Sequence, residues 1–256
     1  ALVWYFDGAV RMAAFAACAV ISVHEMQSAF AQRGCRICVW PLYLFAAAFY
    51  PLGLYLGASC VWVLLGAAFL LMAGEQVLNP RRNAQEAVSG IFVLVYPLVG
   101  YAFLHFLAAM PNAALSRGAL LLVFAVPLLG DTLAYFAGTL WGKRPLAPEI
   151  SPKKTVEGSI AGLFGGALSG FLIYVAQPLY GGELPLFHLL LLGFALGGIG
   201  QVGDLFASGL KRYTGIKDYG RLFPGHGGVM DRLDSVLFCA PAVYLYFHLA
   251  QGGLGL

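Results

Sequence analysis

The stretch ALLLVFAVPLLGDTLAYFAGTLW, residues 119–141, decides the fold, because it runs for 23 residues with one charged side chain, Asp131. A helix needs about 20 mostly apolar residues to cross roughly 30 Å of hydrocarbon, so this stretch predicts a transmembrane helix. The whole chain shares this character: 60% of its 256 residues are apolar and its mean hydropathy is +0.80. Soluble domains contain about 45–50% apolar residues, so we predict an integral membrane protein.

Further apolar windows suggest about eight transmembrane helices in all. The windows are residues 2–25, 38–57, 58–74, 91–109, 119–141, 159–179, 185–209 and 235–250. The two that meet at Gly57 can also be read as one long kinked stretch. A β-barrel would show alternating segments of about ten residues rather than continuous apolar runs. We therefore predict an all-α, polytopic membrane protein.

Basic residues mark one side of the predicted membrane protein. The first, third, fifth and seventh connections hold thirteen of the 15 Lys and Arg residues, and the even connections hold only Arg117. By the positive-inside rule the odd connections are cytoplasmic, so both ends of this chain should face outside. The sequence opens ALVWYFDG without an initiator methionine, and a missing first helix would place the true N-terminus inside.

The two halves of the sequence differ in texture. Residues 1–118 carry few ionisable groups, whereas residues 119–256 hold nine of the 15 basic and eight of the 12 acidic residues. We expect helix packing and dimer contacts from the first half and a catalytic part in the second. Glycines in GSIAGLFGGALSG and GFALGGIGQVGD recur at helical spacing, which favours close helix packing. Cys35 and Cys38 form a CxxC pair without a second metal-ligand pair, so we expect them to pack as small apolar residues.

The first polar constellation is QVGDLFASGLKR, residues 201–212. On a helix Asp204, Ser208 and either Lys211 or Arg212 would share one face. An aspartate this close to the bilayer core is costly unless it is paired or faces water, so a functional role is favoured. The alternative is a charge that reaches to the membrane surface from a helix end.

The second part of this constellation is FPGHGGVMDRLDS, residues 223–235. Asp231 and Asp234 lie three residues apart at a predicted helix start, where the helix dipole favours anions. Together with Asp204 they offer the oxygen ligands that Mg²⁺ prefers. The glycines free backbone N–H groups to approach phosphate oxygens. His226 in this turn fits a phosphate contact as well as a structural hydrogen bond.

A second candidate site lies around the fifth connection. Asp131 stands inside an apolar helix, and SPKKTVEGS, residues 151–159, places two lysines and a possible Thr155 or Ser151 cap before a glycine-rich helix. This is typical of a phosphate-binding helix start, although it is not a P-loop, and a solvated basic loop is an equal alternative. His24 and Glu25 near the end of the first window are expected to be a paired surface charge.

The stretch SGLKRYTGIKDYGRLFPGHGGVMDRLD, residues 208–234, resembles the signature of the phosphatidate cytidylyltransferases, or CDP-diacylglycerol synthases. The upstream segments GDTLAYFAGTLWGK and LAPEISPKKTVEGS are similar to the preceding segments of that family, so the resemblance covers about residues 119–250. Residues 1–118 resemble the family in hydropathy and at Glu25, and the usual first helix is absent or shortened.

The resemblance implies a reaction in which CTP and phosphatidate give CDP-diacylglycerol and pyrophosphate, with Mg²⁺ and room for a second cation. It also implies a bacterial inner membrane, a cytoplasmic active site, lipid entry from the inner leaflet, a homodimer and no nucleic-acid partner. It assigns metal binding to Asp204 and Asp231, with support from Asp218 and Asp234. We expect catalytic roles for Asp204, Asp231, Lys211, Lys217 and Asp218. Substrate-binding roles are expected for Lys153, Lys154, Thr155, Ser208, Arg212, His226, Gly227, Gly228, Arg232 and Asp131.

The rival hypothesis is a membrane transporter for an anionic substrate, which would also explain intramembrane aspartates and glycine-rich helices. It predicts charges near the midplane and matching broken helices in two halves. The charges here gather near one face, and no internal repeat is evident. The CDP-alcohol phosphotransferases are excluded because their DGxxAR pattern is missing.

Overall fold

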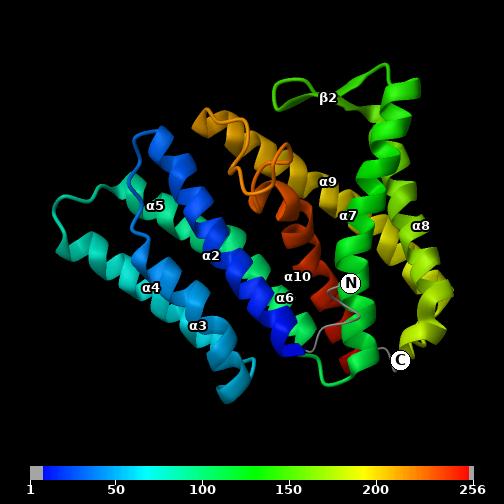
Figure 1. The fold of residues 1–256 in the computed structure, drawn as a ribbon, viewed down its shortest axis with the longest axis horizontal. Coiled ribbons are helices and arrows are strands. Elements are labelled where there is room, and N and C mark those ends of the chain that lie inside the picture. The colour runs from blue at the N-terminus through cyan, green and yellow to red at the C-terminus, as the bar shows by residue number, and fades with distance from the viewer. Residues whose placement is uncertain (1–7, 254–256) are drawn as a thin grey trace. The chain divides into compact units, whose positions relative to one another are not determined.

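A computed structural model describes residues 8–253 and consists of helices joined by short connections, with one small β-hairpin. The elements are α2 (Gly8–Gln32), α3 (Trp40–Leu56), α4 (Cys60–Leu78), α5 (Ala84–Val93), the kinked segment η1 (Leu94–Val99), α6 (Gly100–Ala108), α7 (Ala113–Trp141), β1 (Pro145–Ala147), β2 (Ser151–Thr155), α8 (Val156–Tyr180), α9 (Leu186–Thr214) and α10 (Met230–Gly253), as Figure 1 shows.

The helices confirm an all-α membrane protein. Within residues 8–253, six helical stretches are long and apolar enough to cross a bilayer, and α3 is a shorter apolar helix of 17 residues. One of the six combines α5, η1 and α6 into Ala84–Ala108. This stretch begins seven residues before the predicted window 91–109. The expected total of eight stays a prediction, and residues 2–7 of the first window lie outside the described residues.

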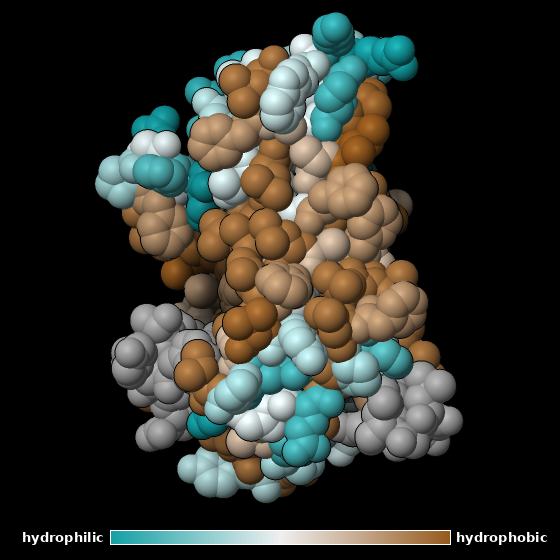
Figure 2. All heavy atoms as spheres, turned by 90° about the vertical axis from the view of Figure 1, so that its right-hand side faces the viewer, coloured by the Kyte–Doolittle hydropathy of each residue, from teal (hydrophilic) through white to brown (hydrophobic). Residues whose placement is uncertain are grey.

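The outer surface of α7 and α8 fits a lipid environment. Large apolar side chains such as Leu128, Phe136, Phe164 and Val175 are exposed on these helices. Figure 2 shows apolar side chains across the middle of this face and polar side chains gathered toward its two ends. Exposure of such an apolar patch to water would be unfavourable, whereas its contact with lipid hydrocarbon carries no such free-energy cost.

The chain forms two compact units. One contains residues 110–210 and 234 onward, which include α7, the hairpin, α8 and most of α9 and α10. The other contains the helices up to residue 109 together with residues 211–233. The polar segment that follows α9 therefore packs with the first half of the sequence, and the division of roles between the two sequence halves stays a prediction.

In the first unit, glycines let α8 and α9 approach closely, as the sequence pattern predicted. A Cβ on Gly166 would overlap the carbonyl of Gly193, and a Cβ on Gly193 would overlap the carbonyl of Gly166. The same holds where Gly170 faces the carbonyl of Leu189. Without a hydrophobic driving force in lipid, such backbone contact is a main source of helix association.

The connection between α7 and α8 folds into the antiparallel hairpin β1–β2 of the first unit. The hairpin delivers Thr155 to the start of α8, where its Oγ1 accepts the N–H of Gly158 at 3.1 Å, so the predicted N-cap is confirmed. It also fixes Lys154 one residue before the cap. The polar stretch 142–158 is therefore an ordered platform rather than a loose surface loop.

In the second unit, α2 is the central helix and anchors the polar segment. The Ser22 hydroxyl is hydrogen-bonded to that of Tyr101 on α6 at 2.8 Å. One turn further along α2, the carboxylate of Glu25 accepts the backbone N–H groups of Val229 and Met230 at 2.9 and 2.8 Å. Glu25 is only 4% exposed, so the expected surface charge is wrong. Its negative charge is balanced by donors at the start of α10, where the helix dipole favours an anion.

We predict that Gly166→Ala separates α8 from α9, because the new methyl group has no room beside the carbonyl of Gly193. Overpacking of this kind costs about 1–3 kcal/mol. The midpoint of thermal unfolding in detergent should fall. Gly66→Ala on α4 is the control, since a Cβ there meets nothing within 4 Å. Equal midpoints for the two variants would contradict the close packing of α8 against α9.

We predict that Glu25→Gln loosens the start of α10. A glutamine amide can accept only one of the two N–H groups, and its NH₂ group would face the other donor. A buried donor without a partner costs about 1–3 kcal/mol. Hydrogen exchange at Val229 and Met230 should accelerate roughly tenfold or more. Glu86→Gln on α5, which breaks an ion pair with Arg82 (3.5 Å) in the preceding connection, should leave these two amides unchanged.

Candidate functional site

The first cluster of predicted residues joins α9 to the hairpin within one unit. Lys154 forms an ion pair with the Oδ2 of Asp204, although 50 residues separate them in sequence. The hydroxyl of Ser208, one turn along α9, donates to the Oδ1 of Asp204 at 3.4 Å. The predicted shared helix face of Asp204 and Ser208 is confirmed. A carboxylate in a membrane helix has thus found both a charge partner and a hydrogen-bond donor.

The second cluster surrounds Asp231 in the first turn of α10. Its Oδ1 accepts from the ammonium of Lys211 at 2.8 Å, and its Oδ2 accepts from the backbone N–H groups of Tyr219 and Gly228 at 2.7 and 3.0 Å. The Asp231 side chain is 4% exposed and that of Lys211 is 16% exposed. The ammonium also lies 5.6 Å from the ring centre of Tyr219. One aspartate therefore closes the whole segment between α9 and α10.

The glycine turn before α10 is shaped by close contacts. Gly227 has a φ of +81°, and a Cβ there would come within 2.8 Å of Asp231 Oδ2, so a side chain would be both strained and crowded. A Cβ on Gly228 would overlap the carboxyl group of Glu25. His226 is exposed, and its Nδ1 lies 3.1 Å from the carbonyl oxygen of Pro224. The carbonyl of His226 accepts from Arg232 Nε at 2.7 Å.

The remaining predicted residues lie in varied surroundings. Lys153, Arg212, Lys217 and Asp218 are exposed, as is Asp131 on α7. Asp234 is buried, and its Oδ1 accepts the N–H of Ser235 at 2.7 Å. Asp204 and Asp234 belong to one compact unit, whereas Asp218 and Asp231 belong to the other. The structure thus brings Asp204 to Lys154 and Asp231 to Lys211, within their own units.

The carboxylates of the two clusters offer oxygen atoms, the type of ligand that a hard divalent cation prefers. Within residues 8–253, no three His, Cys, Asp or Glu side chains are grouped as a ready-made metal site. Mg²⁺ needs only one or two protein carboxylates, since water and substrate phosphates supply its other ligands. Asp204 and Asp231 each hold a lysine ammonium, so each already balances a positive charge at its oxygens. Metal binding by these aspartates stays a prediction.

The CxxC pair has no metal-ligand surroundings among the described residues. Cys35 and Cys38 are buried, and the Cys35 thiol donates to Ser89 Oγ at 3.4 Å. Burial raises the pKa of the Cys38 thiol, which disfavours the thiolate that would bind a metal. Their expected packing role is confirmed.

The sequence did not predict that α2 packs against the polar segment after α9. Glu25 binds the start of α10, while Ser28 and Gln32 line a cavity against residues 216–221. The one sequence signal was a charged residue inside an apolar window, because an intramembrane charge marks function by default. Ser28 and Gln32 gave no signal, since polar residues near a helix end are ordinary.

Comparison with known proteins identifies the family of this chain. The profile of the Cytidylyltransferase family matches residues 1–250. A Staphylococcus saprophyticus protein named Phosphatidate cytidylyltransferase is 35% identical over 70% of this chain and 65% of its own length. A Bacillus subtilis protein of the same name is 36% identical over 76% of this chain and 70% of its own length.

An Escherichia coli K12 protein, Uncharacterized protein YnbB, is 36% identical over 77% of this chain and 70% of its own length. The chain therefore spans about two thirds of the length of these relatives. The match to the family profile extends through both candidate clusters, from Lys154 to Asp231. The chain belongs to the cytidylyltransferase family.

Proposed function

We propose that this protein is a phosphatidate cytidylyltransferase, which converts CTP and phosphatidate into CDP-diacylglycerol and pyrophosphate. The proposal is supported by the names of the Staphylococcus and Bacillus relatives and by the family membership. The observation that carries it is the Lys211–Asp231 pair, in which Asp231 also accepts the backbone N–H groups of Tyr219 and Gly228. Cations held beside carboxylates suit two anionic substrates that would otherwise repel each other.

The proposed reaction is an in-line displacement. A phosphate oxygen of phosphatidate forms a bond to the α-phosphorus of CTP, while the bond to the β-phosphate oxygen breaks and pyrophosphate leaves. The lipid phosphate is largely ionised at neutral pH, so no separate general base is required. Lysines hold and orient the phosphates, and most of the rate enhancement comes from position and charge stabilisation.

Two lysines are suited to this task because they are already held near carboxylates. Lys154 and Lys211 are partly buried, so their charges are screened less by water than those of Lys153 or Lys217. Asp204 and Asp231 would hold Mg²⁺, with support from Asp218 and Asp234. The ion would neutralise charge on the phosphates and orient them. Thr155 keeps Lys154 in place through the cap of α8.

The proposed setting is a bacterial inner membrane with the site on the cytoplasmic face. The support is the positive-inside pattern of the sequence and the bacterial source of the relatives. Phosphatidate would arrive sideways from the inner leaflet. A homodimer, with contacts from the apolar first half, belongs to the same proposal.

The test is pyrophosphate release by purified protein in lipid, with CTP, phosphatidate and Mg²⁺ each omitted in turn. The proposal requires release that needs all three, with CDP-diacylglycerol formed in equal amount. Vesicle-bound protein that moves an anionic substrate across the bilayer without forming CDP-diacylglycerol would instead favour the transporter.

We predict that Asp231→Asn lowers turnover roughly 10²–10³-fold, the scale seen when a charge-stabilising group is removed. Asparagine keeps an oxygen for the N–H groups of Tyr219 and Gly228, so the fold should survive. The variant loses the charge that faces Lys211. The measurement is kcat together with the thermal midpoint. Glu149→Gln, an exposed carboxylate in the hairpin turn, is the control. Near-normal turnover in Asp231→Asn would remove Asp231 from the catalytic centre.

A further inference from the structure

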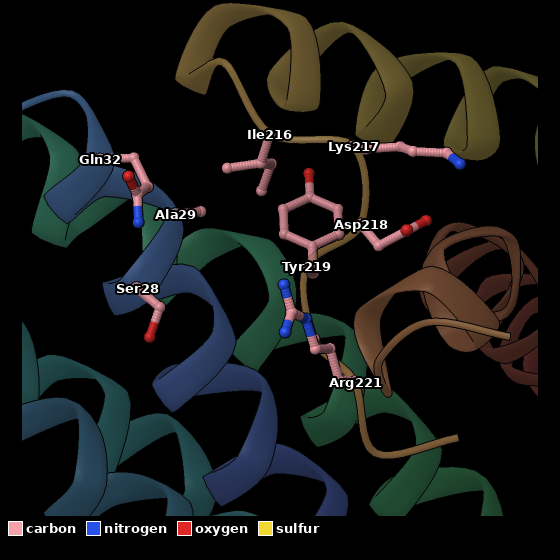
Figure 3. Close-up of a pocket in the computed structure, with 9 residues that line it drawn as sticks. Ser28, Ala29, Gln32, Ile216, Lys217, Asp218, Tyr219 and Arg221 are labelled. Atoms are coloured by element: carbon pink, nitrogen blue, oxygen red, sulfur yellow. The ribbon is translucent and has the colours of Figure 1, made fainter. Parts of the chain in front are cut away.

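A cavity of about 440 Å³ lies between the last turns of α2 and the segment that follows α9. Its walls are Ser28, Ala29 and Gln32 on α2 and residues 216–221 on the other side (Figure 3). This volume falls within the range of small-molecule sites, about 300–1,000 Å³. All of these residues belong to the same compact unit.

The walls of this cavity are fixed at both ends. The Arg33 guanidinium lies 4.9 Å from the ring centre of Tyr213, which joins the end of α2 to the last turn of α9. At the other end, the N–H of Tyr219 donates to Asp231 at 2.7 Å. The cavity is thus built by contacts that also form the candidate site, and a ligand would not have to order it first.

The two faces of the segment 216–221 carry different groups. In Figure 3, Lys217 and Asp218 point away from α2, whereas Gln32 and Ser28 extend from α2 and the Arg221 guanidinium lies between α2 and the segment. The cavity is therefore lined by an amide, a hydroxyl and a guanidinium, with Ala29 and Ile216 as apolar walls. Lys217, Asp218 and Tyr219 also belong to its lining. Within residues 8–253, the side chains of Ser28, Gln32 and Arg221 make no hydrogen bond or ion pair.

This combination suits a flat polar ring attached to an anionic group. A glutamine amide offers one acceptor and two donors, which match the amino group and the ring acceptors of a cytosine edge. The aliphatic walls can pack against the ring, and a guanidinium binds phosphate through its fork of donors. A phosphate can accept from the amide NH₂ group and from the hydroxyl, but it offers no donor to the amide oxygen, whereas the amino group of a cytosine does.

We propose that this cavity holds the cytosine and ribose of CTP, with Gln32 and Ser28 at the base edge and Arg221 at the first phosphate. The inference rests on the proposed function and deepens it, since it assigns recognition of the cytosine base to residues of α2. The reacting phosphates then belong to Lys211, which lies in the same compact unit as the cavity. The base edge is then selected by Gln32 and Ser28, which lie outside the signature segment 208–234, whereas Arg221 lies within it.

The test uses the whole protein in lipid with Gln32→Ala and Gln32→Glu, and Gln85→Ala as the control, an exposed glutamine on α5 away from the cavity. Gln32 is exposed on the last turn of α2, so the variants should fold. Losing about one or two hydrogen bonds should raise the KM for CTP roughly tenfold and narrow the preference for CTP over UTP. The KM for phosphatidate should stay the same.

Binding is measured separately as the rise in thermal midpoint caused by CTP without phosphatidate. Loss of this rise in the Gln32 variants but not in Gln85→Ala supports the cavity, even if wild-type protein releases no pyrophosphate and the proposed reaction fails. An unchanged KM and an unchanged rise for CTP overturn the inference. A raised KM for phosphatidate alone also overturns it and assigns the cavity to the lipid headgroup.

Discussion

A charge next to hydrocarbon must be met by an opposite charge or by hydrogen-bond donors, and the polar part of this protein is arranged by that constraint. Glu25 is met by two backbone N–H groups, Asp204 by Lys154, and Asp231 by Lys211 and two further N–H groups. Glu25 and Asp204 join segments that are distant in sequence, whereas Asp231 closes the segment between α9 and α10. The site is therefore built by the same contacts that make its charges tolerable.

The close approach of the backbone to these carboxylates requires small residues around them. Gly220 and Gly228 lie so close to the Glu25 carboxyl group that a Cβ on either would overlap it. Gly227 is similarly limited by Asp231. Larger residues would push the backbone N–H donors away and leave a buried carboxylate without hydrogen-bond partners. Glycine at these positions serves the carboxylates at least as much as it serves access for a phosphate.

The membrane class and the helices could be predicted well from the sequence, because unbroken apolar runs of about 20 residues match the thickness of a bilayer and are rare in soluble domains. The pairing of Ser208 with Asp204 and the cap at Thr155 could also be predicted, since both follow from helix spacing over a few residues. The role of Glu25 could not be predicted in this way. Its partners lie 204 and 205 residues away in sequence, and the spacing of nearby residues cannot predict such a long-range contact.

The same limit applies to the cavity between α2 and residues 216–221. Its polar lining on α2 comes from ordinary residues, Ser28 and Gln32, whose position matters only after the chain has folded. By contrast, the charged residues of the signature segment stood out because the rest of the chain is so apolar. Composition thus marked the candidate segment, while the structure was needed to show that α2 packs against it.

The long separation between Glu25 and its partners has a consequence for biogenesis. During synthesis, α2 leaves the ribosome and reaches the membrane well before residues 229 and 230 exist. Throughout that interval the carboxylate lacks its final donors, so water at the bilayer surface or the insertion machinery must solvate it. Assembly of the polar segment then has to wait for nearly the whole chain. A cell that stops translation early would accumulate inserted helices without the segment that closes on Glu25.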